Sequence, residues 1–334
     1  MVAGYIKLAE ARASQADRLE EALPLLAGQI GAAQRSGTLN GPGPIFLGIG
    51  ASFAAAAAAV WVLRERGIHS WRLNAGEYPL PFPASDHPLI GVSQSGRSSE
   101  TLAVFRDVPQ AQRLAVLNVV PSPIAEIAAT TFALGNIPDS YASTIGYTAT
   151  VATLAMIAEA WNGGTIDASW SALPQAFRAV EAELARRGTA LAGLLAHAVS
   201  VDYAAAAPSV GSAEVGSLLL REIARISASG FSTRQYLHGA MESAGKTAHV
   251  LVGAERELGA AHMLARAGHA TLLITPLDVP EETNLAVLRL PDLPPAQRSI
   301  LEALVMQTLA VEAAHLRGID PDAFVFFHTD TKVA

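Results

Sequence analysis

Short apolar runs alternate along the first half of the chain with segments of helical periodicity. The runs over 44–49, 89–93 and 113–120 are each followed by a polar turn and then by a helical pattern. Continuous apolar strands separated by helices are typical of a parallel sheet that is covered on both faces. The pattern therefore predicts a doubly wound α/β domain over about 41–165.

A second round of the same pattern follows a helical stretch. Strand-like runs occur over 199–207, 247–254 and 269–276, and a long apolar helix is predicted over 296–318. The order of elements thus occurs twice without a literal repeat, which indicates an internal duplication of one α/β unit. We predict five parts: an N-terminal helical segment, a first domain, a helical linker, a second domain and a C-terminal tail, over 1–40, 41–165, 166–195, 196–318 and 319–334.

Composition and charge exclude several classes of protein. The 334 residues are 51% hydrophobic and 16% charged, with a net charge of −7 and no basic run, so a nucleic-acid partner is not expected. The chain has no cysteine, which rules out disulfides, thiolate metal sites and cysteine nucleophiles. The N-terminus does not resemble a signal peptide, and we expect a cytoplasmic protein.

One uncharged segment, 45–63, is long enough to cross a bilayer. It is mostly alanine, glycine and serine, and alanine gains little from lipid. Its order of residues favours a buried strand, a turn and a helix that ends at Gly67. We therefore predict no membrane span.

Three polar loops lie where predicted strands lead into helices. They read GIGAS over 48–52, SQSGRSSET over 93–101 and YASTIGYT over 141–148. Ligands of open parallel sheets bind beyond the carboxyl ends of the strands, and helix N-termini favour anions. Hydroxyls and backbone N–H groups gathered at that edge would suit a phosphate. The alternative is that these serines only cap helices and shape turns.

Competing motifs are incomplete. GIGASF has Phe53 where the dinucleotide fingerprint needs its third glycine, and Ala240 occupies the glycine position of a P-loop ending in the GKT of 245–247. GVSQS has Ser95 in place of the second glycine of a nucleophile elbow, so a serine hydrolase using Ser93 is a minor alternative. The nine histidines show no metal-ligand spacing, and we predict neither a metal nor a cofactor.

The three loops resemble the ligand loops of the sugar isomerase (SIS) domain, which read G-x-G-x-S, S-Q-S-G-x-[ST]-x-[DE]-T and A-S-T-x-x-[FY]-T. The segment LLLREIARISASGFSTRQYLHGAMES, 218–243, is similar to the second SIS domain of glucosamine-6-phosphate synthases. The resemblance extends from about Ala9 to Asp322. It implies two doubly wound parallel-sheet SIS domains, each a flavodoxin-like three-layer sandwich, in a homodimer with shared active sites.

The resemblance also implies where a small-molecule sugar phosphate binds. The matching positions lie in the three loops and hold the phosphate and neighbouring sugar hydroxyls. They are Gly50, Ala51, Ser52, Ser93, Gln94, Ser95, Ser98 and Ser143. Arg97 stands where relatives often have glutamate, and its role is left open.

Two catalytic positions follow from the same resemblance. Glu222 matches the carboxylate that shuttles a proton between C1 and C2 of an open-chain sugar, and His238 matches the histidine that opens the ring. A carboxylate with a raised pKa and an imidazole suit these two proton transfers at neutral pH. Without the resemblance, Glu222 would be read as a solvated residue paired with Arg221 or Arg225.

Departures from the family pattern limit what can be transferred. Without a cysteine the chain lacks the glutaminase nucleophile, so a glutamine-dependent transaminase is not expected. The family lysine three residues before the catalytic glutamate is Leu219 here. In the tail, Thr329 occupies the position of the Schiff-base lysine, and Lys332 lies three residues further on. Either Lys332 takes that catalytic role, or no imine to the enzyme is formed.

These patterns predict an enzyme of amino-sugar metabolism that acts on a hexose 6-phosphate derivative. It would be a phosphosugar isomerase, or an amino-sugar-phosphate deaminase or deglycase, working by ring opening and 1,2-proton transfer. The alternative is a catalytically silent module that binds a phosphosugar and regulates a partner.

Overall fold

The computed structural model describes residues 5–326 and 331–333 and divides into two compact units. Unit 1 comprises Met1–Pro174 together with Phe326–Ala334, and unit 2 comprises Gln175–Val325. The C-terminal tail is therefore part of the unit that also contains the chain's N-terminus. This return places the tail beside the loops of unit 1.

Unit 1 is built on a five-stranded parallel sheet with the order β2-β1-β3-β4-β5. Its strands are β1 (Ile45–Gly48), β2 (Trp71–Asn74), β3 (Leu89–Ser93), β4 (Arg113–Leu117) and β5 (Thr130–Ala133). In this doubly wound order the topological switch point lies between β1 and β3. The loops that follow these two strands therefore meet at the edge where ligands bind.

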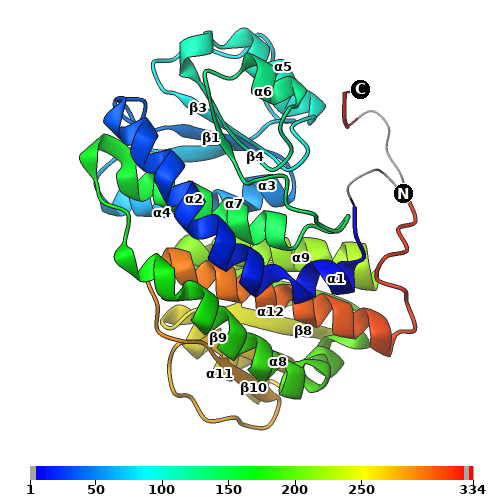
Figure 1. Cartoon of the computed structure of the whole chain (residues 1–334). Coiled ribbons are helices and arrows are strands. Elements are labelled where there is room, and N and C mark those ends of the chain that lie inside the picture. The colour runs from blue at the N-terminus through cyan, green and yellow to red at the C-terminus, as the bar shows by residue number, and fades with distance from the viewer. Residues whose placement is uncertain (1–4, 327–330, 334) are drawn as a thin grey trace. The chain divides into compact units, whose positions relative to one another are not determined.

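Helices cover both faces of this sheet (Figure 1). Helices α5 and α6 pack together over one face, whereas α3 and α4 pack with the long α7 and α2 on the other. The helices are α1 (Leu8–Ala13), α2 (Gln15–Arg35), α3 (Ala51–Ala55), α4 (Ala57–Glu65), α5 (Ser99–Asp107), α6 (Pro123–Ile127) and α7 (Ile145–Ala160), with 3-10 turns at Gln110–Gln112, Trp161–Gly163 and Ala168–Ala172. Burial on both faces explains why the strands are continuously apolar.

The alanine-rich segment differs in one detail from the sequence expectation. It forms a strand, a turn and a helical region as predicted, but the region is two helices, α3 and α4, which meet at Ala56. Ala54 to Ala59 are all buried, and both helices contact α7. Small side chains at these positions let α7 approach closely.

Unit 2 repeats the topology of unit 1. Its parallel sheet has the order β10-β9-β8-β6-β7, which is the same doubly wound order when the strands are counted from β6. The strands are β6 (Ser200–Ala205), β7 (Ser227–Ser232), β8 (Thr247–Val252), β9 (Ala270–Thr275) and β10 (Leu285–Arg289). The helices are α8 (Leu173–Ala196), which begins in unit 1, α9 (Val210–Ala224), α10 (Thr233–Leu237), α11 (Arg256–Arg266) and α12 (Pro295–Leu316), with 3-10 turns at Ala207–Ser209 and Ala240–Ser243. The predicted fold class is confirmed.

Strand β7 was not predicted from the sequence, because SASGFS carries no apolar run. It pairs with β6 at the edge of the sheet and is only partly buried. A Cβ on Gly230 would lie 2.8 Å from the carbonyl oxygen of Ala213, so glycine lets α9 lie directly against the strand. Pairing with β6 and close packing against α9, rather than a hydrophobic pattern in its own sequence, therefore determine strand β7.

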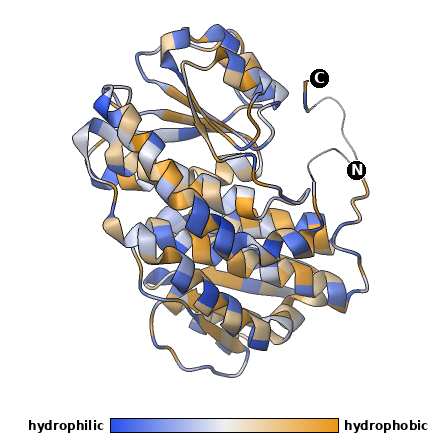
Figure 2. Ribbon diagram, in the orientation of Figure 1, coloured by the Kyte–Doolittle hydropathy of each residue, from blue (hydrophilic) through white to orange (hydrophobic). Residues whose placement is uncertain are grey.

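Helix α12 is long and apolar enough to span a membrane by length and composition, but 83% of that stretch is buried within the structure. It packs against α9 in unit 2. In Figure 2 the strands are mostly hydrophobic, while the helices carry both hydrophobic and hydrophilic residues. The burial of α12 identifies it as a core helix of unit 2.

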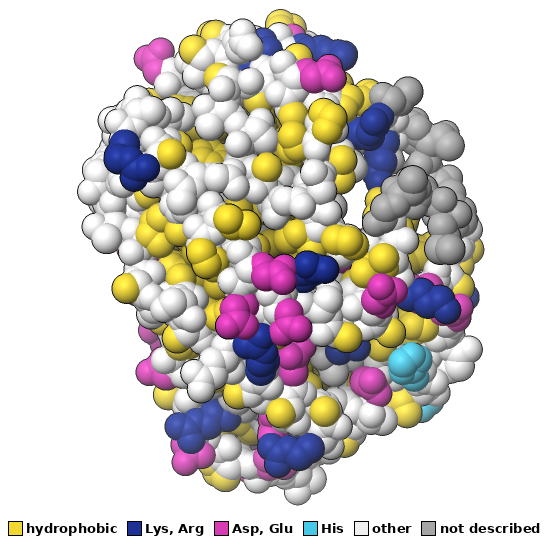
Figure 3. Space-filling model, viewed as in Figure 1, with side chains coloured by type: hydrophobic (Ala, Val, Ile, Leu, Met, Phe, Trp, Pro, Cys, Tyr) yellow, Lys and Arg dark blue, Asp and Glu magenta, His cyan; other side chains and the backbone are white. Residues whose placement is uncertain are grey.

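Charged side chains of both signs are interspersed on the face of the molecule shown in Figure 3. The chain carries 23 lysines and arginines and 30 acidic residues. This face therefore has no large patch of only positive or only negative side chains that would attract a charged ligand.

Candidate active site

The loop over 93–98, here called the serine loop, follows β3. The Ser93 and Ser98 hydroxyl oxygens lie 2.9 Å apart, and the Gly96 backbone N–H donates to Ser93 Oγ at 3.1 Å. The Arg97 backbone N–H donates to Ser95 Oγ at 3.3 Å. Three of the predicted serines are thus gathered in one tight turn at the carboxyl end of β3.

Only glycine fits at position 96. Its φ is +63°, and a Cβ there would lie 2.0 Å from Ser122 Oγ. Its carbonyl accepts the Ile124 N–H at 3.1 Å, which ties the serine loop to the start of α6. The turn is therefore held in one shape by its neighbours.

Helix α5 begins immediately after the serine loop without a side-chain cap. Ser98 is the N-cap residue but bonds Ser93 instead of the helix N–H groups. The Ser99 N–H donates to the Thr331 carbonyl of the tail at 3.2 Å, and Ser99 Oγ donates to Glu100 at 3.0 Å. Uncapped N–H groups and the helix dipole favour an anion at this end of α5.

The loop after β1 holds Gly50, Ala51 and Ser52. Gly50 has φ +57° and precedes α3, and the Ser52 N–H donates to the Ile49 carbonyl at 3.2 Å. Since β1 pairs with β3, this loop and the serine loop adjoin at the switch point. The structure therefore brings the first two predicted loops to the same edge.

The third loop differs from the expectation that it offers unpaired N–H groups. The Asp139 carboxylate lies at the N-terminus of α7 and accepts from Ser143 Oγ at 2.8 Å, from the Thr144 N–H at 3.0 Å and from the Gly146 N–H at 2.9 Å. It also accepts from Gln94 Nε2 at 3.4 Å. Asp139 thus fills the position of an anion here and orients both Ser143 and Gln94.

Asp139 was missed by the sequence reasoning. It lies just before the recognised motif, six residues before α7 begins. An aspartate before a helix is a common capping signal, and this signal could have identified it.

Glu222 lies in the last turn of α9 and is half-buried. Burial raises the pKa of its carboxyl group to about 7. Arg221 Nε donates instead to the Ala228 carbonyl at 2.5 Å, and Arg225 donates to the Ala323 carbonyl at 2.7 Å. Within residues 5–326 and 331–333, Glu222 has no hydrogen bond or ion pair, so its reading as a solvated, arginine-paired residue is wrong.

His238 is exposed and directly follows α10. Its backbone N–H closes the helix by donating to the Arg234 and Gln235 carbonyls at 3.1 and 3.2 Å. The short helix is anchored by Tyr236, which is fully buried and whose hydroxyl lies 2.8 Å from His249 Nδ1 on β8. This bond supports the position of His238 two residues later.

His249, the hydrogen-bond partner of Tyr236, is neutral over the physiological pH range. Burial lowers the pKa of His249 to about 4, and the charge of His269 acts in the same direction. His249 Nε2 lies 3.0 Å from Thr247 Oγ1, so both ring nitrogens are hydrogen-bonded. A neutral imidazole can use one nitrogen as donor and the other as acceptor here.

Lys332 lies in the tail at the serine loop. It pairs with Ser98 in an antiparallel bridge, and the Val333 N–H donates to the Arg97 carbonyl at 3.0 Å. Its Nζ donates to the Tyr5 hydroxyl at 3.2 Å and lies 5.9 Å from the ring centre of Tyr141. Thr329, at the family lysine's position, lies outside the described residues.

A cavity of about 620 Å³ lies between the serine loop, the N-terminal segment and the tail. Its wall includes the predicted residues Gln94, Ser95 and Lys332. Tyr5, Arg97 and Asp139 also line it. Of the predicted residues of unit 1, Gln94, Ser95 and Lys332 thus line this cavity, whereas Glu222 and His238 belong to unit 2. The remaining predicted residues are not among the cavity's lining: Gly50, Ala51, Ser52, Ser93, Ser98 and Ser143.

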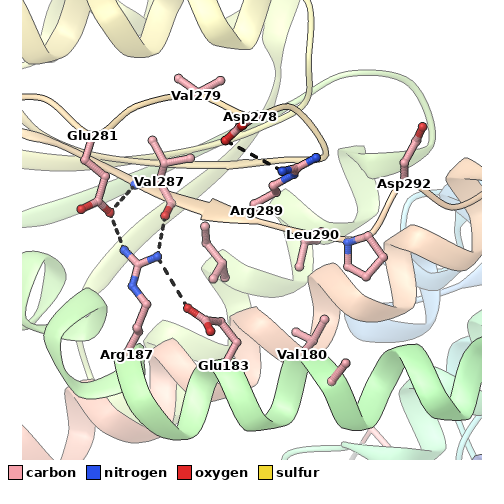
Figure 4. Close-up of a pocket in the computed structure, with 13 residues that line it drawn as sticks. Val180, Glu183, Arg187, Asp278, Val279, Glu281, Val287, Arg289, Leu290 and Asp292 are labelled. Carbon is pink, nitrogen blue, oxygen red and sulfur yellow. Dashed lines mark hydrogen bonds and ion pairs between the residues drawn. The ribbon is translucent and has the colours of Figure 1, made fainter.

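A second cavity of about 620 Å³ lies in unit 2 beside β10 (Figure 4). Arg187 donates to the Val287 carbonyl at 2.9 Å and pairs with Glu281, which in turn accepts the Val287 N–H at 3.1 Å. These bonds, that from Val287 foremost, lower the pKa of Glu281. Arg289 pairs with Asp278 at 3.8 Å. The arginines of this cavity are thus paired with carboxylates of the same cavity. Charged side chains beside β10 also disfavour pairing of this edge strand with another chain.

Metal binding finds no support among residues 5–326 and 331–333, where no three histidine, aspartate or glutamate side chains gather as a group that could hold an ion. The cavity of unit 1 offers a hydroxyl, amides and a carboxylate, and unit 2 separately carries the Glu222 carboxyl group and the His238 imidazole. This donor set suits a phosphorylated polyol and proton transfer.

The fold matches that of solved phosphosugar isomerases with two sugar-isomerase (SIS) domains. It matches the C-terminal domain of glucosamine-fructose-6-phosphate aminotransferase from Francisella tularensis with a TM-score of 0.80 at 18% identity, over 96% of this chain and 98% of that one. It matches tagatose-6-phosphate ketose/aldose isomerase from Escherichia coli with a TM-score of 0.78 at 16% identity, over 96% of each chain. Glucosamine-6-phosphate deaminase from Thermotoga maritima follows with a TM-score of 0.70 at 15% identity, over 95% and 97%.

In sequence the chain resembles the isomerase part of glutamine–fructose-6-phosphate aminotransferases. It is 28% identical to that of Zymomonas mobilis over 293 residues, which is 81% of this chain and 48% of the relative. The chain therefore spans about half the length of the curated relatives it matches. No family model matches the chain.

Proposed function

We propose that the chain is a phosphosugar isomerase, or an amino-sugar-phosphate deaminase or deglycase, that acts on a hexose 6-phosphate derivative. The observation that carries this proposal is Glu222, a half-buried carboxylate without an ion-pair partner in the described chain and with a pKa of about 7. Such a group can take and return a carbon-bound proton at neutral pH. A purely structural glutamate would instead be paired or solvated.

The proposed reaction uses three parts of the chain. The serine loop holds the 6-phosphate through its hydroxyls and the uncapped N-terminus of α5. His238 exchanges a proton with the ring oxygen and so opens the ring. The Glu222 carboxylate then removes the proton from C1 or C2, leaving an enediol or enamine, and returns it to the adjacent carbon.

The substrate class is proposed from the relatives. They include a glutamine–fructose-6-phosphate aminotransferase, a tagatose-6-phosphate ketose/aldose isomerase and a glucosamine-6-phosphate deaminase. All three names contain a hexose 6-phosphate. We therefore propose a 6-phosphorylated hexose that carries nitrogen at C1 or C2.

We further propose that the working form is a homodimer. His238 is exposed at the end of α10 in the single chain. A ring-opening histidine needs an enclosed site, and a second chain would enclose it. The dimer would thus combine His238 of one chain with the site of the other.

Deuterium exchange tests the proposal directly. The chain is incubated in heavy water with fructose 6-phosphate, tagatose 6-phosphate and glucosamine 6-phosphate, and isotope entry at C1 or C2 is followed by NMR. Glu222→Gln should slow exchange by about 10³-fold. Glu255→Gln removes an exposed carboxylate of unit 2 and should leave the rate unchanged. A Glu222→Gln protein that exchanges as fast as the parent would rule out this assignment.

The rival function is a phosphosugar-binding regulator without catalysis. It predicts binding of a sugar phosphate in a thermal-shift assay with no isotope exchange for any sugar that binds. A serine hydrolase is disfavoured by the geometry, because Ser93 Oγ bonds Ser98 and Gly96, and no histidine of the described chain contacts it. Labelling of Ser93 by a fluorophosphonate would revive that alternative.

A further inference from the structure

The cavity of unit 1 contains two cations that the proposed reaction does not use. Within residues 5–326 and 331–333, the Arg97 guanidinium donates only to the Val333 carbonyl, at 3.5 Å, and Lys332 Nζ only to the Tyr5 hydroxyl, at 3.2 Å. In the part of the chain that the structure describes, neither forms an ion pair. Both nevertheless line the same cavity of about 620 Å³.

The other polar groups of this cavity are already engaged. Asn118 exchanges two hydrogen bonds with the Ile137 backbone, both at 2.8 Å, and Asn136 does the same with Val120 at 2.9 and 3.0 Å. The Asp139 carboxylate is directed at the N-terminus of α7. The available charge of the cavity is therefore positive, in a chain whose net charge is −7.

Backbone pairing holds the two cations at the serine loop. Lys332 lies opposite Ser98 in an antiparallel bridge, and the Val333 N–H donates to the Arg97 carbonyl at 3.0 Å. Val333 also packs against the hydrophobic core of unit 1. The tail is therefore anchored at the serine loop.

The surroundings of Lys332 are those of an ammonium ion. Its Nζ lies 5.8 Å from the ring centre of Tyr5 and 5.9 Å from that of Tyr141, and aromatic faces attract the charged form. An imine-forming lysine instead needs a desolvated, uncharged amine. Lys332 is exposed, which is the opposite setting.

The second cavity provides a contrast within the same chain. It has a similar volume, but its guanidinium groups are paired with carboxylates, Arg187 with Glu281 and Arg289 with Asp278. Arg97 and Lys332 have no such partners among residues 5–326 and 331–333. An anion is the ligand that would supply them.

We propose that Arg97 and Lys332 form an anion-binding subsite beside the serine loop, which takes a phosphate or carboxylate group of the ligand, and that Lys332 acts there as a cation and not through an imine. The subsite adds a ligand-binding element to the proposed function. The claim that Lys332 forms no imine depends on that proposed function. It also assigns a role to Arg97, which the family pattern leaves unexplained.

Binding of inorganic phosphate at low salt, measured by calorimetry, tests the subsite without any need for turnover. Arg97→Gln with Lys332→Gln should weaken binding by at least about tenfold. Lys246→Gln with Arg256→Gln makes the same change in net charge at exposed positions of unit 2 and should bind like the parent. Lys332→Arg keeps the positive charge and should bind phosphate with an affinity within about threefold of the parent's. Equal binding by the two double variants would overturn the subsite.

Borohydride trapping with fructose 6-phosphate tests the second half of the proposal. Intact mass should show no adduct, and Lys332→Arg should retain isotope exchange within about threefold. An adduct mapped to Lys332 would overturn the cationic role. Phosphate binding through the two cations without isotope exchange by the parent would refute the proposed function and leave the subsite standing.

Discussion

Two helix N-termini, one in each unit, differ in what they offer to an anion. In unit 2, α9 begins beside the fully buried carboxylate of Glu302, which accepts from Ser209 Oγ at 2.8 Å and from Ser212 Oγ at 2.7 Å. Arg298 Nε lies 3.5 Å away as its ion-pair partner. In unit 1, α5 begins at the serine loop with no side-chain cap. In unit 2 a carboxyl group of the chain occupies this place, whereas in unit 1 no side chain caps the helix.

The same contrast exists within unit 1. Helix α7 is capped by Asp139, which takes up the donors of the third loop. Of the two ligand-facing helices of eight or more residues in unit 1, α5 is thus the one with an open N-terminus. The proposed function would thus use one fold twice, in unit 1 to bind an anion and in unit 2 to carry Glu222 at the other end of α9.

Removing the internal anion of unit 2 should have the largest effect on stability. Glu302→Ala leaves the partly buried Arg298 with only the exposed Asp292, 3.9 Å away, and two buried serines without their acceptor, which should cost about 3–5 kcal/mol of unfolding free energy. Urea denaturation followed by circular dichroism measures this loss. Glu302→Gln keeps the shape and should lose less.

A rescue experiment sharpens the same comparison. Phosphate at high concentration should restabilise Glu302→Ala more than Glu302→Gln, because an external anion can enter the vacated place. Phosphate binding at the serine loop should stay unchanged. A Glu302→Ala protein as stable as the parent would show that this carboxylate is not an internal counterpart of the ligand.

The serine loop should be broken by one methyl group. Gly96→Ala combines a φ of +63° with a Cβ 2.0 Å from Ser122 Oγ, and we expect a loss of about 2–3 kcal/mol together with most of the phosphate binding. Gly67→Ala is the matched control, since its φ is +74° but its Cβ would meet nothing within 4 Å. It should cost about 1 kcal/mol and leave phosphate binding intact.

The outcome that contradicts this prediction is a Gly96→Ala protein with normal phosphate affinity. The clash with Ser122 can be separated from the backbone strain by adding Ser122→Gly. That double variant should recover part of the stability, because the strain of the positive φ remains.

Glu222 should make the protein less stable as the pH rises. Its pKa is about 7 in the folded chain against an ordinary 4.5, so between these values the unfolded chain releases a proton that the folded chain retains. Stability contributed by this group is therefore lost from pH 4.5 upward, and the loss is complete above about pH 7. Glu222→Gln should be more stable than the parent by about 1–3 kcal/mol at pH 8 and equally stable at pH 4.

Thermal unfolding at pH 4, 6 and 8 measures this difference. A gap between the two proteins that does not change with pH would mean that the carboxylate is not strained by burial. The rate of isotope exchange should rise through the same window, because the proton acceptor is the ionised form.

Much of the fold follows from local patterns in the sequence. The apolar runs that predicted β1, β3 and β4 are buried strands, because a parallel sheet covered on both faces leaves no polar positions. Strand β7 was missed because SASGFS carries no apolar run, and pairing with β6 holds it at the edge of the sheet. Strand β10, LAVLR, was missed although it is apolar. The break between α3 and α4 at Ala56 was also missed, because a run of alanines fits one continuous helix as well as two short ones.

The site could be predicted only where a short motif carries it. The serine loop forms within six residues, and Ser93, Ser95 and Ser98 bond there as neighbours. Asp139, Glu302 and the Tyr236–His249 pair were missed. Glu302 is 93 residues from Ser209, and only the tertiary fold brings such partners together. A glutamate inside the apolar helix α12 was nevertheless a signal of a buried polar cluster.

The smallest predicted effect concerns the support of His238 in unit 2. Tyr236→Phe removes the hydroxyl that lies 2.8 Å from His249 Nδ1 and leaves a buried ring nitrogen without its partner. We expect a loss of about 1 kcal/mol in unfolding free energy. Phe231→Leu, which changes a neighbouring ring and no hydrogen bond, is the control.

Catalysis separates positioning from stability in this variant. If α10 places His238 for ring opening, Tyr236→Phe should lower kcat about threefold for a sugar phosphate that closes into a ring. The rate should not change for a 5-deoxy analogue of fructose 6-phosphate, which has no O5 and cannot close the furanose ring. An equal loss for both substrates would mean that the Tyr236–His249 bond only stabilises unit 2, and the proposed link between this buried pair and His238 would then be wrong.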